Sequence, residues 1–178
     1  MEKTRFSTMD CPIARSLDRV GEWWSILILR DAVGGMTRFE EFQKSLNIAP
    51  NMLTRRLTAL VDAGLMEKRR YCARPPRDEY VLTGRGRDFR PVLLALLAFG
   101  NRHFAPEGAS VAIVDAETGA PAEPLLIDRR TGRPLASPEF DLAPGPAATE
   151  ATKARLAVRA ARLLGSDNRI PSGKEAGT

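Results

Sequence analysis

Apolar residues recur every three or four positions through the first third of the chain, a spacing that indicates helices with one buried face. The first helix is expected from Cys11-Pro12 to Gly21, because proline suits the first turn of a helix. Its apolar face consists of Ile13, Leu17 and Val20. Residues 24–33 are apolar on nearly every side, which predicts a central helix surrounded by other elements.

Two short amphipathic segments come next, separated by a tight turn at residues 47–49. Thr37 and Glu40 have the spacing of a capping box at the start of the first segment. Pro50 opens the second segment, and Gly64 ends it. The positions expected to be buried are Phe39, Phe42, Leu46, Leu53, Leu57, Leu60 and Val61. A short helix, a tight turn and a second helix with an exposed polar face form a helix-turn-helix pattern.

A β-hairpin is predicted directly after the second of these helices. Its strands are expected over residues 66–72 and 77–82, and the prolines in the loop 73–76 oppose both a helix and a continued ladder. This loop would project as a wing. A long helix is expected to follow over residues 84–104, with an apolar face broader than one small core requires, which indicates a surface for a partner.

Beyond residue 104 the chain becomes rich in Ala, Pro and Gly, and a short phrase is repeated. Residues 114–119 and 127–132 each join a β-prone lead-in to an Asp-x-x-Thr-Gly turn, which predicts a small β-meander over about residues 110–136. The fold class is therefore mainly α with a small β-hairpin wing, a winged helix-turn-helix with a C-terminal hairpin and helix extension. The expected organisation is a flexible tail over 1–10, a main domain over 11–104, an extension and linker over 105–146, a helix over 147–165 and a disordered tail over 166–178.

The charge balance narrows the class of partner. The 178 residues include 27 Lys and Arg against 22 Asp and Glu, a net charge of +5 with a sequence pI near 9.7, which favours nucleic acid or an anionic membrane surface. No apolar run is long enough to span a membrane and no signal-peptide core is present, so a cytoplasmic, nucleoid-associated protein without a membrane partner is expected. Cys11, Cys72 and His103 form no metal-ligand pattern, so neither a metal nor a cofactor is expected.

The helix that begins at Pro50 carries side chains that can read bases. When its leucines face inward, its outward stripe holds Asn51, Arg55 and Thr58. Asparagine can read adenine and arginine can read guanine through paired hydrogen bonds, while Met52 can meet a thymine methyl group. Thr54 and Arg56 lie at the flanks, where phosphate contacts and an intradomain salt bridge both remain open. In an isolated helix such residues would more often be a solvated surface, but the adjacent turn, wing and basic charge favour DNA contacts.

The expected wing is basic on both strands. Because successive side chains of a strand point to opposite faces, Lys68, Arg69 and Arg70 cannot all face DNA, and at least one is expected to be merely solvated. Arg74 at the tip and Arg77 on the return strand are expected to approach phosphates or the minor groove. Such contacts position a protein on DNA and make its affinity depend on salt, without specifying sequence.

Several short segments follow one another in a fixed order over about residues 11–104. They are Cys11-Pro12-Ile13-Ala14, Gly21-Glu22 with Trp24, Ile28-Leu29-Arg30-Asp31, Arg38-Phe39-Glu40-Glu41-Phe42, the run from Ile48 to Leu57, Gly64-Leu65, Pro75-Pro76-Arg77, Glu79-Tyr80 and Leu82-Thr83. In this ordered combination the chain resembles the HxlR-type winged helix-turn-helix regulators of bacteria. It departs from them at Ala49, where the family often has a serine cap, and at Gly84, where glutamate is usual.

The resemblance implies a homodimer that binds an inverted-repeat operator in double-stranded DNA, with repression favoured over activation. The helix after Pro50 would enter the major groove, the wing would lie near the minor groove, and the first helix and residues 84–104 would form the dimer. The alternative is a winged-helix module that contacts proteins without specific DNA binding. An enzyme is not expected, because no nucleophile-elbow, phosphate-binding or metal-ligand motif occurs.

Two kinds of signal are candidates for regulating the protein. Some members of the resembled family sense oxidants or electrophiles through a cysteine at the place of Cys11, and the proline-started helix after it would make the thiol reactive. The other interpretation of Cys11 is a small apolar residue packed at the dimer interface. A small organic effector is the second candidate signal, held in an aromatic pocket that would otherwise be packed core and interface. The pocket residues are Trp23, Trp24, Phe99 and Phe104.

Overall fold

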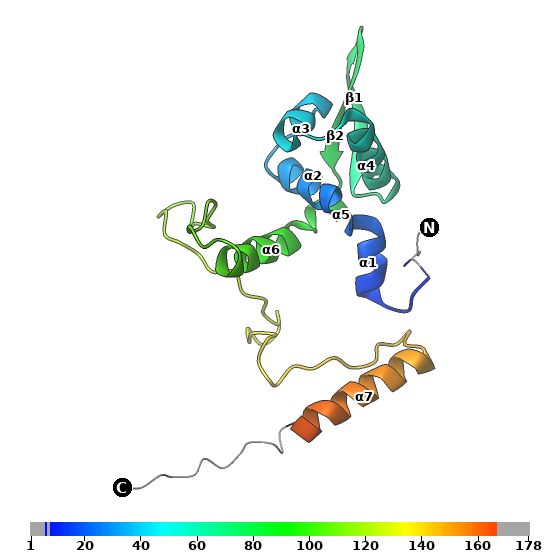
Figure 1. The fold of residues 1–178 in the computed structure, drawn as a ribbon, viewed down its shortest axis with the longest axis vertical. Helices are drawn as coiled ribbons and strands as arrows, with labels where there is room; N and C mark the ends of the chain where they lie inside the picture. Colours follow the sequence, from blue (N-terminus) through cyan, green and yellow to red (C-terminus); the bar gives the residue numbers. More distant parts are fainter. Residues whose placement is uncertain (1–5, 7, 167–178) are drawn as a thin grey trace.

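The computed structural model describes residue 6 and residues 8–166, with side chains up to residue 161. In chain order the elements are α1 (Pro12–Val20), α2 (Trp23–Val33), α3 (Phe39–Leu46), α4 (Pro50–Asp62), β1 (Met66–Ala73), β2 (Pro76–Leu82), α5 (Gly84–Arg87), α6 (Arg90–His103) and α7 (Glu150–Ser166). Figure 1 shows the hairpin projecting beyond the helices at one end and α7 at the other. The predicted winged helix-turn-helix is confirmed, and the tail predicted beyond Ser166 lies outside the described residues.

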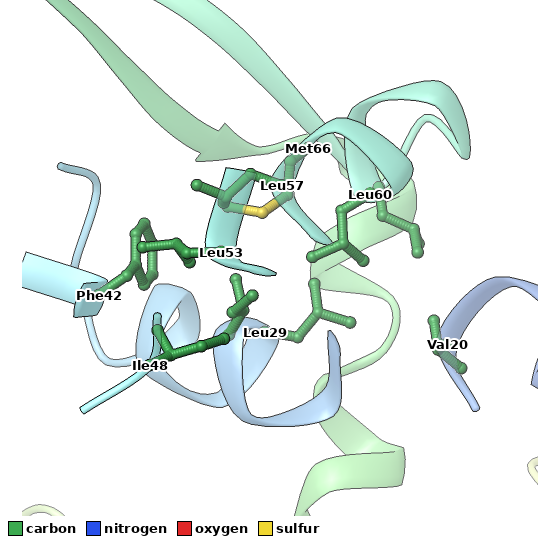
Figure 2. Packing of buried hydrophobic residues seen from close by; sticks show 10 residues of the cluster. Val20, Leu29, Phe42, Ile48, Leu53, Leu57, Leu60 and Met66 are labelled. Atoms are coloured by element: carbon green, nitrogen blue, oxygen red, sulfur yellow. The ribbon is translucent and has the colours of Figure 1, made fainter. Parts of the chain in front are cut away.

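The hydrophobic core lies between α2, α3, α4 and the base of the wing (Figure 2). Leu29 of α2 and Leu53, Leu57 and Leu60 of α4 have no exposed surface, and Met66 at the start of β1 is 1% exposed. Burying one such side chain contributes about 1.5–3 kcal/mol relative to leaving it in water. The three leucines therefore hold α4 with its opposite face outward.

The start of α3 differs from the sequence prediction. The N-cap is Arg38, and Glu41 Oε2 accepts hydrogen bonds from the backbone N–H groups of Thr37 and Arg38 at 2.9 and 2.8 Å. The expected capping box of Thr37 with Glu40 is wrong, because two adjacent glutamates fit the spacing and only the true N-cap selects between them. Gly64, directly after the C-terminal end of α4, has a φ of +68°. This left-handed conformation is what its predicted role as the helix stop requires.

The wing is a two-stranded antiparallel hairpin with a shorter turn than predicted. The strands pair from Met66 with Leu82 to Ala73 with Pro76, so the turn consists of Arg74 and Pro75. Pro76 was expected to end the ladder, but proline is tolerated at the first residue of a strand. The register shifts between Arg70 and Cys72, which indicates a β-bulge there.

The helix predicted over residues 84–104 is divided into α5 and α6. Pro91 lies in the first turn of α6, and because proline lacks an N–H and disfavours a helical residue before it, one helix cannot continue through this point. No residue of α6 is buried, and even its large apolar side chains are uncovered: Leu96 is 46% and Phe99 55% exposed. α6 packs against α2 and leaves most of its apolar face uncovered in the single chain.

Residues 105–148, which we call the extension, contain two narrow turns in place of the predicted β-meander. Isolated bridges close them, Val114 with Pro121 and Ile127 with Pro134. Each return position is a proline, which has no N–H to donate to a ladder, so a sheet cannot grow from either bridge. The aspartates act as predicted in the turns. Asp115, for example, accepts hydrogen bonds from the Thr118 N–H and hydroxyl at 2.8 and 2.9 Å, and these bonds lower the pKa of Asp115.

The start of α7 is tied to the N-terminal segment before α1. Thr149 donates its N–H and hydroxyl to Asp10 Oδ2 at 3.1 and 2.6 Å, and the Thr152 hydroxyl donates to the same oxygen at 2.7 Å. These hydrogen bonds lower the pKa of Asp10 to about 2. We call this contact the Asp10 clasp. It anchors part of a segment that the sequence predicts to be flexible.

Candidate nucleic-acid interface

The outward face of α4 is formed by polar side chains on a helix that is anchored from behind by its leucines. The exposed residues are Asn51, Thr54, Arg55, Thr58 and Ala59. Within the described part of the chain Arg55 has no ion-pair or hydrogen-bond partner, so its guanidinium is available to a ligand. The Thr54 hydroxyl donates to the Pro50 carbonyl oxygen at 2.9 Å, and Met52 is half-buried against the core.

Arg56 behaves differently from its neighbour Arg55. Its guanidinium lies 2.9 Å from Glu22 Oε2, and the Arg56 side chain is only 13% exposed. The Arg56 Nε is buried and has no hydrogen-bond partner in the described structure. Of the two possibilities that the sequence leaves open for Arg56, the structure contains the intradomain salt bridge. This bridge joins α4 to the residue that precedes α2, and so it helps to position α4.

The strands of the wing pair their basic residues with carboxylates. Lys68 Nζ lies 2.9 Å from Asp78 Oδ2, and Arg70 Nε lies 3.3 Å from Asp78 Oδ1. Arg69 pairs with Glu67. The hydrogen bond from Lys68 holds the pKa of Asp78 below its usual value. These pairs neutralise much of the charge of the strands, so the tip residue Arg74 is left as an exposed cation without a carboxylate partner among the described residues.

Arg77 belongs to a basic cluster that the sequence alone did not indicate. The Arg38 guanidinium lies 4.9 Å from the centre of the Tyr71 ring, in cation–π geometry. A hydrogen bond with Tyr71 also raises the pKa of Arg77. Two arginines from different elements therefore meet at Tyr71, beside a cavity of about 400 Å³ between α3 and the wing. Tyr71 is placed here by the bulge, which no periodic pattern in the sequence marks.

The two candidate signal sites differ in how far the structure forms them. Cys11 is a half-buried free thiol at the N-cap of α1, directly after Asp10 of the clasp. The four aromatic residues expected to form a pocket do not enclose one in the single chain, because Trp23 and Phe104 are each 73% exposed. A separate cavity of about 390 Å³ opens between α2, β2 and the start of α6. Its lining consists of Ala32, Val33, Met36, Thr37, Val81, Leu82, Arg87 and Arg90.

The described residues hold neither a metal-binding cluster nor a membrane-spanning helix. They contain no group of three or more His, Cys, Asp or Glu side chains arranged to hold a metal ion. No helix among them combines the length and the apolar character needed to cross a membrane.

Comparison with known proteins gives consistent matches over this domain. Residues 19–108 match the family model described as HxlR-like helix-turn-helix. An HTH-type transcriptional regulator of Mycobacterium tuberculosis is 35% identical over 135 residues, which cover 75% of this chain and 85% of that protein. An alignment of this length runs past the end of the family match and includes part of the extension.

Two solved structures add to this similarity. A transcription factor of Pseudomonas aeruginosa (PA1374) is 54% identical, with a TM-score of 0.60, and the match covers 82% of this chain and 100% of that chain. The redox regulator HypR in its reduced form is 31% identical, with a TM-score of 0.50, and the match covers 55% of this chain and 99% of that chain.

Proposed function

Because the chain belongs to the HxlR-like helix-turn-helix family and is a transcription regulator rather than an enzyme, we propose that it binds an inverted-repeat operator in double-stranded DNA as a homodimer and represses transcription. The observation that carries this proposal is the exposed stripe of Asn51, Arg55 and Thr58 on α4. The leucines behind it have no exposed surface, so the stripe is presented on a rigid helix.

In this proposal α4 lies in the major groove, which admits an α-helix. Arg55 reads a guanine and Asn51 an adenine, each through paired hydrogen bonds. Thr58 lies one helical turn beyond Arg55, and Thr54 and Met52 contribute at the edges of the stripe. Arg56 supports this arrangement from behind through Glu22 and contributes little direct contact, because its side chain is 13% exposed.

The wing supplies contacts that do not depend on sequence. Arg74 at the tip is exposed and approaches the minor groove or its phosphates. Arg77 and Arg38, held together at Tyr71, contact phosphates beside the major groove. These cations release counterions from DNA, so the proposed affinity falls steeply as salt is added.

Two apolar surfaces support the proposed homodimer. Ile13 and Leu17 on α1 are 71% and 50% exposed, and they belong to the face expected to be buried. Leu96 and Phe99 on α6 are similarly uncovered. A second copy that covers these faces removes them from water and presents two α4 helices to successive turns of the same DNA face.

Selection of bound sequences from a random pool of duplex DNA tests the proposal. A symmetric motif with half-sites about one helical turn apart is the expected product. A variant with Asn51→Ala and Arg55→Ala, which retains the wing, serves as the control and should enrich no motif while still binding weakly. If the unaltered protein shows no salt-sensitive binding to any duplex, the chain is instead a protein-interaction module. Transcription from a promoter with the selected site then tests repression, since added protein should lower the yield of transcript.

Release of the operator is proposed to follow oxidation of Cys11 by an oxidant or electrophile. The N-cap position exposes this thiol to free helix amides, and the structurally similar HypR is a redox regulator. Diamide should release DNA from the unaltered protein and from Cys72→Ser, but not from Cys11→Ser. An unchanged response in Cys11→Ser would leave a small organic effector, for which the cavity between α2, β2 and α6 is available.

A further inference from the structure

The extension is held at both ends but buries almost none of its own apolar side chains. At its start, the Asn101 side-chain amide of α6 donates to the Val111 carbonyl oxygen at 2.9 Å. At its end, the Asp10 clasp fixes Thr149 and the first turn of α7. Figure 1 shows the path between these two anchors, which runs apart from the winged domain. The extension is therefore held in place without being packed.

The exposed side chains of the extension are those that proteins usually bury. Leu125 and Leu126 are each 63% exposed, and Leu142 is 67% exposed. Phe104, directly before the extension, is 73% exposed as well. Large apolar side chains that a single chain leaves exposed together mark a site of association.

The exposed surface area of the chain is larger than that of a compact monomer. The chain exposes 14345 Å², whereas a compact monomer of 19.5 kDa is expected to expose about 8,500 Å². Complete exposure of the residues outside the described ranges would account for about half of this excess, since an extended residue exposes about 160 Å². The remainder, about 2,900 Å², is larger than the roughly 1,000–2,500 Å² per partner that a stable homodimer buries, so the chain has enough uncovered surface for such a contact.

We propose that the extension is an arm of the dimer, which packs Leu125, Leu126 and Leu142 against a second copy of the chain. This inference rests on the proposed homodimer and goes beyond its pairing of α1 and α6. The second copy is the occupant because the arm starts at the end of α6, where Asn101 holds Val111, so its near end lies beside one helix of the proposed contact. The Asp10 clasp holds the far end of the arm beside α1, the other helix of that contact.

Sedimentation equilibrium of full-length variants tests the arm. The test variant is Leu125→Glu with Leu126→Glu, and its matched control is Ala120→Glu with Ala122→Glu, which adds the same charge at exposed alanines of the extension. The test variant should raise the dimer Kd about tenfold or more, as for loss of interface hot spots, and the control should change it by less than about threefold. Thermal unfolding of the monomer should be unaffected, because both leucines are exposed in the single chain.

A third variant tests the homodimer independently of the arm. Leu96→Glu with Phe99→Glu on α6 should give monomers if the proposed helix contact exists. If this variant is monomeric while the Leu125/Leu126 variant dimerises as the unaltered protein does, the arm is refuted and the homodimer stands. If the unaltered protein is monomeric at all concentrations, the homodimer and the arm both fail.

Hydrogen exchange of the unaltered protein, measured above and below its dimer Kd, provides a second readout. Amides of residues 122–142 should exchange more slowly in the dimer than in the monomer, because the single chain leaves most of this segment exposed. Equal protection in the monomer would mean that the arm folds onto its own chain, which would overturn the inference. Equal lack of protection in both states would also overturn it.

Discussion

Replacing Arg55 or its neighbour Arg56 with alanine should separate DNA recognition from stability. The two arginines are adjacent on α4, yet Arg55 is exposed and without a partner in the described structure, whereas Arg56 pairs with Glu22 at 2.9 Å and is 13% exposed. Each substitution removes the same guanidinium from the same helix. Each variant is therefore the matched control for the other.

The structure predicts different losses of operator affinity and of stability for the two variants. Loss of a bidentate contact between Arg55 and a base should cost about 1–3 kcal/mol, or about 5- to 150-fold in operator affinity, and relax one base position. Its effect on the free energy of unfolding should stay within about 0.5 kcal/mol, as for other surface positions. Arg56→Ala should lower the free energy of unfolding by about 1–2 kcal/mol. This loss lies between those expected for exposed and for buried ion pairs, because the Glu22 side chain is 40% exposed and screened by water.

Mobility-shift titrations on matched and mutated operators, together with urea unfolding of the same preparations, measure both quantities. Arg55→Ala should bind the matched site and the site mutated at the base that Arg55 reads almost equally, and it should unfold at the normal urea concentration. Arg56→Ala should retain its preference among sequences and unfold earlier. An equal loss on every sequence for Arg55→Ala would remove its base-reading role, and an unchanged unfolding midpoint for Arg56→Ala would refute the supporting role of the ion pair.

Other predictions follow from single contacts. Gly86→Ala should destabilise the fold by about 3 kcal/mol in urea unfolding, because the new Cβ would lie 2.0 Å from the Leu65 carbonyl oxygen, whereas Gly84→Ala meets nothing within 4 Å and should not destabilise it. The pKa of Asp10 is lowered to about 2 from a model-peptide value of 3.8, so the clasp should be complete above about pH 4 and lost as the pH falls through about 2. The Thr149 amide signal in NMR should titrate with that lower midpoint, and a midpoint near 4 would contradict the clasp. Arg74→Ala should weaken binding to all DNA sequences alike and reduce the slope of affinity against salt by about one unit; a loss confined to one operator would contradict a phosphate contact.

Much of the winged domain could be predicted because its elements are encoded locally. The stripe of Leu53, Leu57 and Leu60 recurs at helical spacing, and Gly64 marks the end of α4 through its own backbone preference. Local signals were ambiguous where two residues fit one pattern, as for Glu40 and Glu41 at the start of α3. The prediction is wrong at Pro76, because it treats proline only as a residue that ends a strand. Pro76 instead begins β2, which makes the turn shorter than predicted.

The candidate site was predicted in part for the same reason. Helical periodicity suffices to place Asn51, Arg55 and Thr58 on one face, because neighbours on that face are three or four residues apart. The role of Arg56 depends instead on a partner from another helix. The meeting of Arg38 and Arg77 at Tyr71 depends on a bulge in β1, which has no periodic signature.

The sequence by itself therefore determined the helices up to α4, the wing, the inward face of α4 and the family to which the chain belongs. Only the tertiary structure decided which charged residues pair and which stay free, because the partners come from distant parts of the chain. The Asp10 clasp joins residues 139 positions apart, and no local propensity specifies such a contact. The uncovered faces of α6 and the extension are also tertiary information, since burial depends on what the rest of the fold brings to a surface and on what it leaves for a partner.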